Sequence, residues 1–170
     1  MPAELLQALG LGPGERVLAW SSLVGGGAAA ATIRGLRIIT PRGKLISRSW
    51  VGVDHAVWDQ DSAMLVVWWV DSRQPTPLEI LDDVGRLPEV IRERVQASVV
   101  LSTSVVLPGG PIARVALRRD ASGELSAQSL LPPGVRADAP DVARLLQKAT
   151  AGLWAEAGEV GLSTTPPPPL

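Results

Sequence analysis

The stretch SVVLSTSVVLPGGPIARVALRRDASGELSAQSLL, residues 98–131, decides the fold class of this chain. Hydrophobic residues recur at every second position in three segments, which the turn compositions PGGP and DASG separate. Because successive side chains of a β-strand point to opposite faces, this alternation predicts three strands in an antiparallel meander. The predicted core face of this meander consists of Val99, Leu101, Val105, Leu107, Ala113, Val115, Leu117, Leu125, Ala127 and Leu131.

The segment that follows, PDVARLLQKATAGLWAEA at residues 140–157, has helical periodicity. Its apolar stripe of Val142, Leu145, Leu146, Ala149 and Leu153 predicts an amphipathic helix. We expect this helix to cover the core face of the meander. Residues 158–170, GEVGLSTTPPPPL, are predicted to form a disordered, proline-rich tail.

The first half of the chain predicts a short helix over the first ten residues and then about four strands, at residues 16–24, 31–39, 45–58 with a bend near Gly52, and 63–70. Residues 71–86 leave two alternatives open: a helix start with a capping box at residues 76–79, or a short edge strand. A helix of two to three turns is expected over residues 88–97.

The glycine run GGGAAA at residues 25–30 fits the GxGxxA dinucleotide fingerprint. A Rossmann helix needs several turns after the glycines, whereas the next strand pattern begins almost at once. The fingerprint also requires an acid about 20 residues further on, but the first one is Asp54. We therefore predict a glycine-rich hairpin connection and no cofactor.

The cluster DHAVWDQD at residues 54–61 contains the only histidine, and three aspartates beside it. If residues 59–62 form a four-residue loop, His55 lies opposite Val66, and Asp54 points to the other face of the strand. A regular strand then keeps these side chains too far apart to share one metal ion. With no cysteine and no GxSxG motif, nucleophilic catalysis also has little support. We expect no catalytic, cofactor or metal site.

Composition and charge limit the location and the partners. The chain has no cysteine, and no basic residue precedes Arg16, so we expect a cytoplasmic protein without a secretory signal. The uncharged segment 17–33 is short and rich in small residues, and we expect no membrane span. Charges occur in bands, with six basic residues and no acid in residues 16–53, then nine acids in residues 54–93. The interpretation that we favour is that strands of opposite sign pair across a sheet.

The order of these elements, together with GERVLAW (residues 14–20) and ATIRGLRII (residues 31–39), resembles the bacterial pleckstrin-homology-like (PH-like) proteins. The segment LPEVIRERVQASVVLS (residues 87–102) resembles uncharacterised actinobacterial members of that group. The resemblance implies an α+β, mainly antiparallel fold: a PH-like, partly open barrel of about seven strands, with a connector helix and a C-terminal capping helix. It implies a domain over residues 14–157, preceded by an N-terminal segment at residues 1–13.

The resemblance also implies binding of lipids, peptides or other proteins. Members of the family that bind phosphoinositides carry clustered Lys and Arg around the first strand-to-strand loop. Here that loop, LVGGGAAAA, has no charge. We therefore do not expect phosphoinositide binding.

These observations lead to the hypothesis of a non-enzymatic binding or scaffold module whose partner is a protein. Trp68 and Trp69 are adjacent on a predicted strand, so they cannot both face one core, and they are the candidate interaction residues. The alternative hypothesis is an anion or nucleic-acid binder, with Trp50 as a stacking platform and a basic surface made of Arg34, Arg37, Arg42, Lys44 and Arg48.

Overall fold

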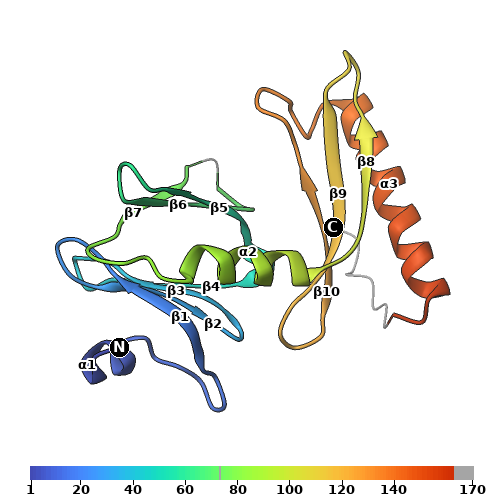
Figure 1. The fold of residues 1–170 in the computed structure, drawn as a ribbon. Helices are drawn as coiled ribbons and strands as arrows, with labels where there is room; N and C mark the ends of the chain where they lie inside the picture. Colours follow the sequence, from blue (N-terminus) through green and yellow to red (C-terminus); the bar gives the residue numbers. More distant parts are fainter. Residues whose placement is uncertain (73, 163–170) are drawn as a thin grey trace. The chain divides into compact units, whose positions relative to one another are not determined.

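The computed structural model describes residues 1–72 and 74–162 (Figure 1). The chain divides into two compact units, which we call unit 1 (Met1–Ala97) and unit 2 (Ser98–Leu170). The described residues form ten strands in three antiparallel sheets, together with a few helices. The predicted α+β, mainly antiparallel class is confirmed. The expected strand number of about seven is too low, and the described strands form three sheets and no closed barrel.

Unit 1 contains two of the sheets. The first has the order β1-β2-β3-β4, and the second has the order β5-β6-β7. The elements, in chain order, are α1 (Ala3–Ala8), β1 (Val17–Ser22), β2 (Ala28–Thr32), β3 (Gly35–Ile39), β4 (Leu45–Ser49), the 3-10 turn η1 (Trp50–Gly52), β5 (Val53–Asp59), β6 (Met64–Trp69), β7 (Thr76–Glu79) and α2 (Leu87–Ser98).

Two open points of the sequence are resolved in unit 1. The bend near Gly52 is real, because η1 separates β4 from β5 and the two strands belong to different sheets. Residues 76–79 form the edge strand β7, so the alternative of a helix start with a capping box there is wrong.

The glycine run forms the connection between β1 and β2, as predicted. All three glycines have positive φ, a conformation that L-residues rarely adopt. A Cβ at Gly27 would also overlap the backbone carbonyl of Ile39. The alanines that follow form strand β2, not a helix, so the dinucleotide fingerprint has no structural counterpart.

The core of unit 1 is shared by both sheets and by α2. Leu36 and Ile38 come from the first sheet, Leu65 and Val67 come from the second, and Ile91 comes from α2; all five side chains are fully buried. The two sheets are joined at the ends of β1 and β7, where the Val24 N–H donates to the Glu79 carbonyl at 2.9 Å. Hydrophobic burial from three sides therefore stabilises this unit.

A second, smaller core covers the other face of the first sheet. Leu9 is fully buried there, and Leu5 of α1 packs beside it. On β2 the run of small alanines is buried on both faces, which allows close approach from either side. The remaining residues of this small core are Ala30, Ile39, Met1, Leu11, Val17 and Trp20.

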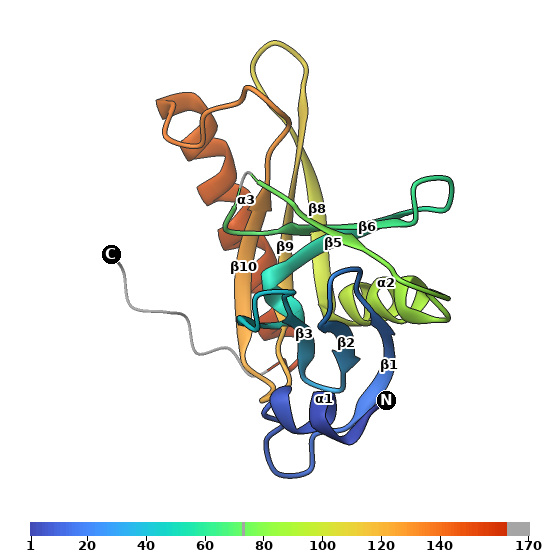
Figure 2. The same cartoon turned by 90° about the vertical axis from the view of Figure 1, so that its left-hand side faces the viewer.

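Unit 2 is the predicted meander with its covering helix. Its elements are β8 (Val99–Val106), β9 (Ile112–Arg119), β10 (Leu125–Leu130) and α3 (Pro140–Glu159), and the strand order is β10-β9-β8. The helix α3 runs along the sheet and packs against β8 and β9 (Figures 1 and 2).

The apolar cluster of unit 2 confirms the main part of the predicted core face. Ala113, Val115 and Leu117 of β9 are fully buried, and Leu146 and Leu153 of α3 pack in the same cluster. This placement corrects one expectation, because the C-terminal helix covers the meander and does not cap a barrel of seven strands. Residues 163–170 of the predicted proline-rich tail lie outside the described residues.

Two further expectations concern segments of unit 1. Residues 17–33 contain β1, the connecting loop and β2, and no described helix is long and apolar enough to cross a membrane. The favoured interpretation of the charge bands is wrong, because β3 pairs with β4 inside the basic band and β5, β6 and β7 pair inside the acidic band. Strands of like sign therefore share a sheet.

Candidate functional site

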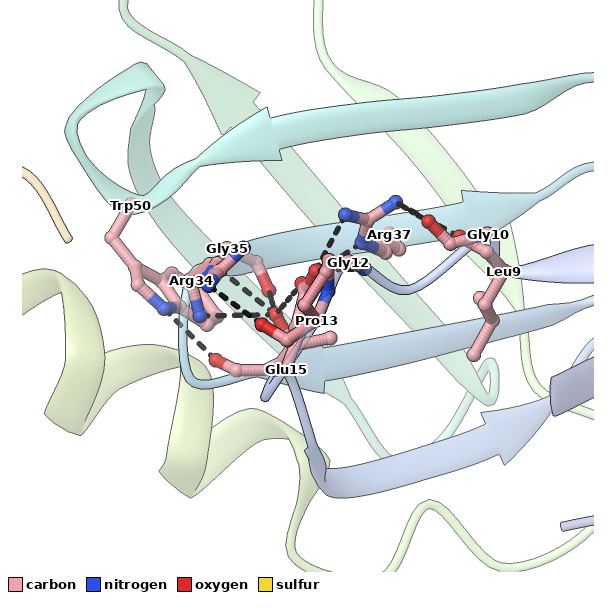
Figure 3. Close-up of polar contacts among 10 residues, drawn as sticks. Leu9, Gly10, Gly12, Pro13, Glu15, Arg34, Gly35, Arg37 and Trp50 are labelled. Carbon is pink, nitrogen blue, oxygen red and sulfur yellow. Dashed lines mark hydrogen bonds and ion pairs between the residues drawn. The ribbon is translucent and has the colours of Figure 1, made fainter. Parts of the chain in front are cut away.

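Arg37 of β3, a candidate anion-binding residue, is held by a buried carboxylate (Figure 3). Its Nε and Nη2 donate to the two carboxylate oxygens of Glu15 at 3.0 and 2.7 Å. Its Nη1 donates to the backbone carbonyls of Leu9 and Gly10 at 2.8 and 3.2 Å. The side chain of Glu15 is only 1% exposed. This bidentate pair fastens the N-terminal segment to the first sheet.

Thr32, at the end of β2, extends the same polar network. Its hydroxyl donates to Glu15 at 2.7 Å and accepts hydrogen bonds from the backbone N–H groups of Arg34 and Gly35. Its carbonyl accepts a hydrogen bond from Trp50 Nε1 at 3.1 Å. Trp50 is buried and forms part of the core, so the structure does not present it as a stacking platform.

The network controls the ionisation of Glu15. Burial by itself raises the pKa of this carboxyl, but hydrogen bonds from Arg37, Thr32 and the Gly12 N–H outweigh burial and lower the pKa to about 2. The carboxylate is therefore ionised at neutral pH, with its acceptor positions occupied by the protein. Such an arrangement is structural and leaves no lone pair for chemistry on a substrate.

The five basic residues of the candidate set do not all lie on one surface. Strand register places Arg48 opposite Leu36, so Arg48 and Arg37 lie on opposite faces of the first sheet. Arg48 pairs with Asp71 at 3.0 Å and lies 6.0 Å from the centre of the Trp69 ring. Arg34 donates to the Pro13 carbonyl at 2.9 Å. The remaining two, Arg42 and Lys44, are exposed near the turn between β3 and β4.

The β5–β6 hairpin has a different register from the predicted one. His55 lies opposite Trp68, not opposite Val66, and the pairing extends to Asp59 opposite Met64. The loop consists of residues 60–63, where Ala63 adopts a positive φ of 52°. A register shift of two residues preserves the faces of most side chains, so the predicted partition of the hairpin largely survives.

A β-bulge between Val53 and His55 changes the predicted geometry at Asp54. Two residues of a bulged strand oppose one residue of the partner strand, so alternation is interrupted there. The Asp54 carboxylate consequently lies 3.0 Å from His55 Nδ1, and the expectation that these side chains diverge is wrong. The same bulge turns Val53 into the core, where it is fully buried.

The two adjacent tryptophans lie in different environments, as the alternation predicts. Trp69 is 8% exposed, packs in the core of unit 1, and donates from Nε1 to the Thr76 hydroxyl at 2.8 Å. Trp68 lies on the other face and is half-buried. Its ring stacks on His55, with 5.7 Å between ring centres and 12° between planes.

Trp68 belongs to an apolar surface that we call the outer face of the second sheet. Val57, opposite Val66, is 51% exposed, and Pro77 of the edge strand is exposed beside Val66. Because paired residues share a face of a sheet, the register defines this surface. It consists of His55, Val57, Met64, Val66, Trp68 and Pro77.

Acids surround this outer face. Asp59 and Asp61 lie at the hairpin end, Glu79 ends β7, and Asp54 pairs with His55. Hydrogen bonds from the Ser62 hydroxyl and the Asp61 N–H lower the pKa of Asp59, so it is ionised at neutral pH. The arrangement is an apolar, aromatic patch with a negative rim.

The described residues contain no group of three or more histidine, aspartate or glutamate side chains placed to hold a metal ion. No family model, curated protein or solved structure matches this chain.

The sequence did not predict the role of one important residue, Glu15. The available signal was its position, since it is the acid immediately before the basic band of residues 16–53.

Proposed function

We propose that this protein is a non-enzymatic binding module, and that it binds another protein through the outer face of the second sheet. The observation that carries the proposal is the uncovered apolar patch around Val57 and Trp68, on a sheet whose other face is already packed in a core. Contiguous apolar surface with a polar rim is typical of protein interaction sites.

The composition of the patch indicates the chemistry of the partner. Tryptophan is favoured at the centre of interfaces because its large ring loses little conformational entropy on binding. The stacked His55 restrains the Trp68 ring before any partner arrives. The acids at positions 54, 59, 61 and 79 favour a partner with an apolar centre and Lys or Arg around it.

We also propose that unit 1 is PH-like. Its seven strands form sheets of four and three around one core, and the helix α2 follows the last strand and packs in that core. This arrangement lies within residues 17–98, a part of the predicted domain over residues 14–157. The uncharged β1–β2 loop supports a protein partner over a phosphoinositide.

A pair of matched substitutions tests the proposed surface. Val57→Glu places a charge in the patch, and Val160→Glu changes a similarly exposed valine, 62% against 51%, in unit 2. Proteins captured from the native host by the wild type serve as binding partners for measurement by calorimetry. We expect Val57→Glu and Trp68→Ala to weaken their binding about 10-fold or more, and Val160→Glu to leave it unchanged. Equal binding by the wild type and by all three variants contradicts the proposal.

The alternative, anion or nucleic-acid binding through residues 34–48, is supported by the exposure of Arg42 and Lys44. It is weakened by the Glu15–Arg37 pair, which occupies one of the five cations. A titration of a single-stranded oligonucleotide at increasing salt separates the two hypotheses, because phosphate-driven binding falls steeply with salt. Steep, salt-sensitive binding that Arg42→Ala and Lys44→Ala together abolish would favour the alternative.

A further inference from the structure

A groove lies in unit 2 between the strand β8 and the helix α3. Its volume is about 570 Å³, and it is lined by Thr103, Ser104, Val105, Val106, Leu145, Lys148, Ala149, Gly152, Leu153 and Glu156. Within the described residues, β8 pairs with β9 on one side only. This edge strand is eight residues long and contains neither a charged residue nor a proline. Natural proteins usually protect a strand edge of this kind, because it pairs readily with another strand.

Gly152 keeps the wall of the groove open. It is an exposed residue inside a 20-residue helix, where glycine costs about 1 kcal/mol relative to alanine. Its φ is not positive, and a Cβ at this position would contact nothing within 4 Å. The fold of this chain therefore does not require glycine here. A missing side chain does, however, allow another backbone or helix to approach α3 closely.

The charges beside the groove complement one another under twofold symmetry. Gly152 lies midway between Lys148 and Glu156, four residues from each. Both charged side chains are exposed, and neither forms an ion pair with a described residue. If two copies of α3 lie antiparallel and cross at Gly152, Lys148 of each copy faces Glu156 of the other. A twofold axis produces this match twice.

We propose that the occupant of this groove is a second copy of the chain, so that β8 pairs with β8 across a twofold axis and the two α3 helices pack antiparallel at Gly152. The spacing of the elements fits this arrangement. Paired strands lie about 4.8 Å apart. The twofold axis lies midway between the two β8 strands, and α3, which packs against both β8 and β9, lies above the line midway between those two strands. The helix axis is therefore displaced from the twofold axis by one strand spacing, about 5 Å. The two helices are then about 10 Å apart, within the range of packed helices.

The experiment measures association of the full chain by sedimentation equilibrium over a wide concentration range. We expect a monomer–dimer equilibrium in the wild type. Lys148→Glu and Glu156→Lys each replace two attractive pairs by two repulsive ones, and each should weaken the dimer about 10-fold or more. Gly152→Leu adds a large side chain to the groove wall, at a position where a Cβ would contact nothing within 4 Å, and it should abolish the dimer. Circular dichroism melts of each variant establish that the fold is retained.

Mixing the two charge variants tests whether positions 148 and 156 of one copy face these positions of the other copy. A copy with Glu at both positions faces a copy with Lys at both, so the mixture should form a heterodimer that is tighter than the homodimer of either variant. The proposal is overturned by a wild type that stays monomeric at every concentration, or by a dimer insensitive to Lys148→Glu and Gly152→Leu. A mixture of the charge variants that fails to associate overturns it as well.

Discussion

The two units cover their sheets in different ways. Unit 1 packs both faces of its first sheet, one against the second sheet and α2, and the other against the N-terminal segment that Glu15 and Arg37 hold in place. The described part of unit 2 has one apolar cluster, between its sheet and α3, and its charges at positions 148 and 156 stay exposed beside an open strand edge. The Glu15–Arg37 pair of unit 1 is thus internal and satisfied, whereas Lys148 and Glu156 of unit 2 are available to a partner at the groove.

The comparison is tested most strongly by removing one partner of the internal pair. Arg37→Met leaves the carboxylate of Glu15 buried without its counterion, and removal of one partner of a buried pair is costly. We expect a loss of about 4 kcal/mol in the free energy of unfolding, measured by urea denaturation. Arg144→Met, which breaks an exposed pair with Asp141 in unit 2, serves as the control and should cost less than about 1 kcal/mol.

The separateness of the two cores is tested by one truncation in each unit. Leu36→Ala and Leu153→Ala each remove a buried side chain, and each should cost about 3 kcal/mol. Each cluster consists of residues from its own unit. Hydrogen exchange should therefore quicken in β2, β3 and α2 for the first variant, and in β8, β9 and α3 for the second. Equal acceleration in both units for either variant would contradict this view.

Acid should selectively weaken the internal pair of unit 1. The pKa of Glu15 is lowered from 4.5 to about 2, so the unfolded chain takes up a proton at a higher pH than the folded one. The stability that this carboxylate contributes is complete above pH 4.5 and is lost as the pH falls through 2, and it amounts to about 3 kcal/mol. Urea unfolding of the wild type and of Glu15→Gln between these pH values should show their difference in stability shrinking. A constant difference would rule out this linkage.

The smallest expected effect concerns the turn between β9 and β10 in unit 2. The Asp120 carboxylate accepts hydrogen bonds from the Ser122 hydroxyl and from the N–H groups of Ser122 and Glu124, and the Ser122 hydroxyl is the main reason for its lowered pKa. Asp120→Ala should cost about 1 kcal/mol, measured by thermal unfolding. A loss as large as that of Arg37→Met would mean that unit 2 also depends on an internal acid.

Much of the fold could be predicted because it is local. The alternation in residues 98–131 identified three strands, and the stripe in residues 140–157 identified the helix that covers them. The hairpin of β5 and β6 shows the limit of prediction from local sequence patterns. Its strands were expected from the sequence, but its register depends on a loop at residues 60–63 and on a bulge at Asp54, which the pattern of hydrophobic residues does not encode.

The candidate binding surfaces also could be predicted only in part from the sequence. The adjacency of Trp68 and Trp69 required that they face opposite sides of the sheet, and they do. The basic residues 34–48 looked equivalent along the chain. In the structure Arg37 is bound by Glu15, and Arg48 lies on the other face beside Asp71. Their availability depends on partners that are 22 and 23 residues away in sequence.

The sequence by itself determined the α+β fold class, the positions of most strands and helices, and the helix that covers the meander. It could do so because hydrophobic periodicity reflects the conformation of a few neighbouring residues. Only the tertiary structure decided that the strands form three separate sheets, that Arg37 is bound internally, and that Val57 and Trp68 share an uncovered face. It also placed Gly152 beside the open edge of β8. These features depend on contacts between distant segments, and no local pattern specifies which distant segment will be the partner.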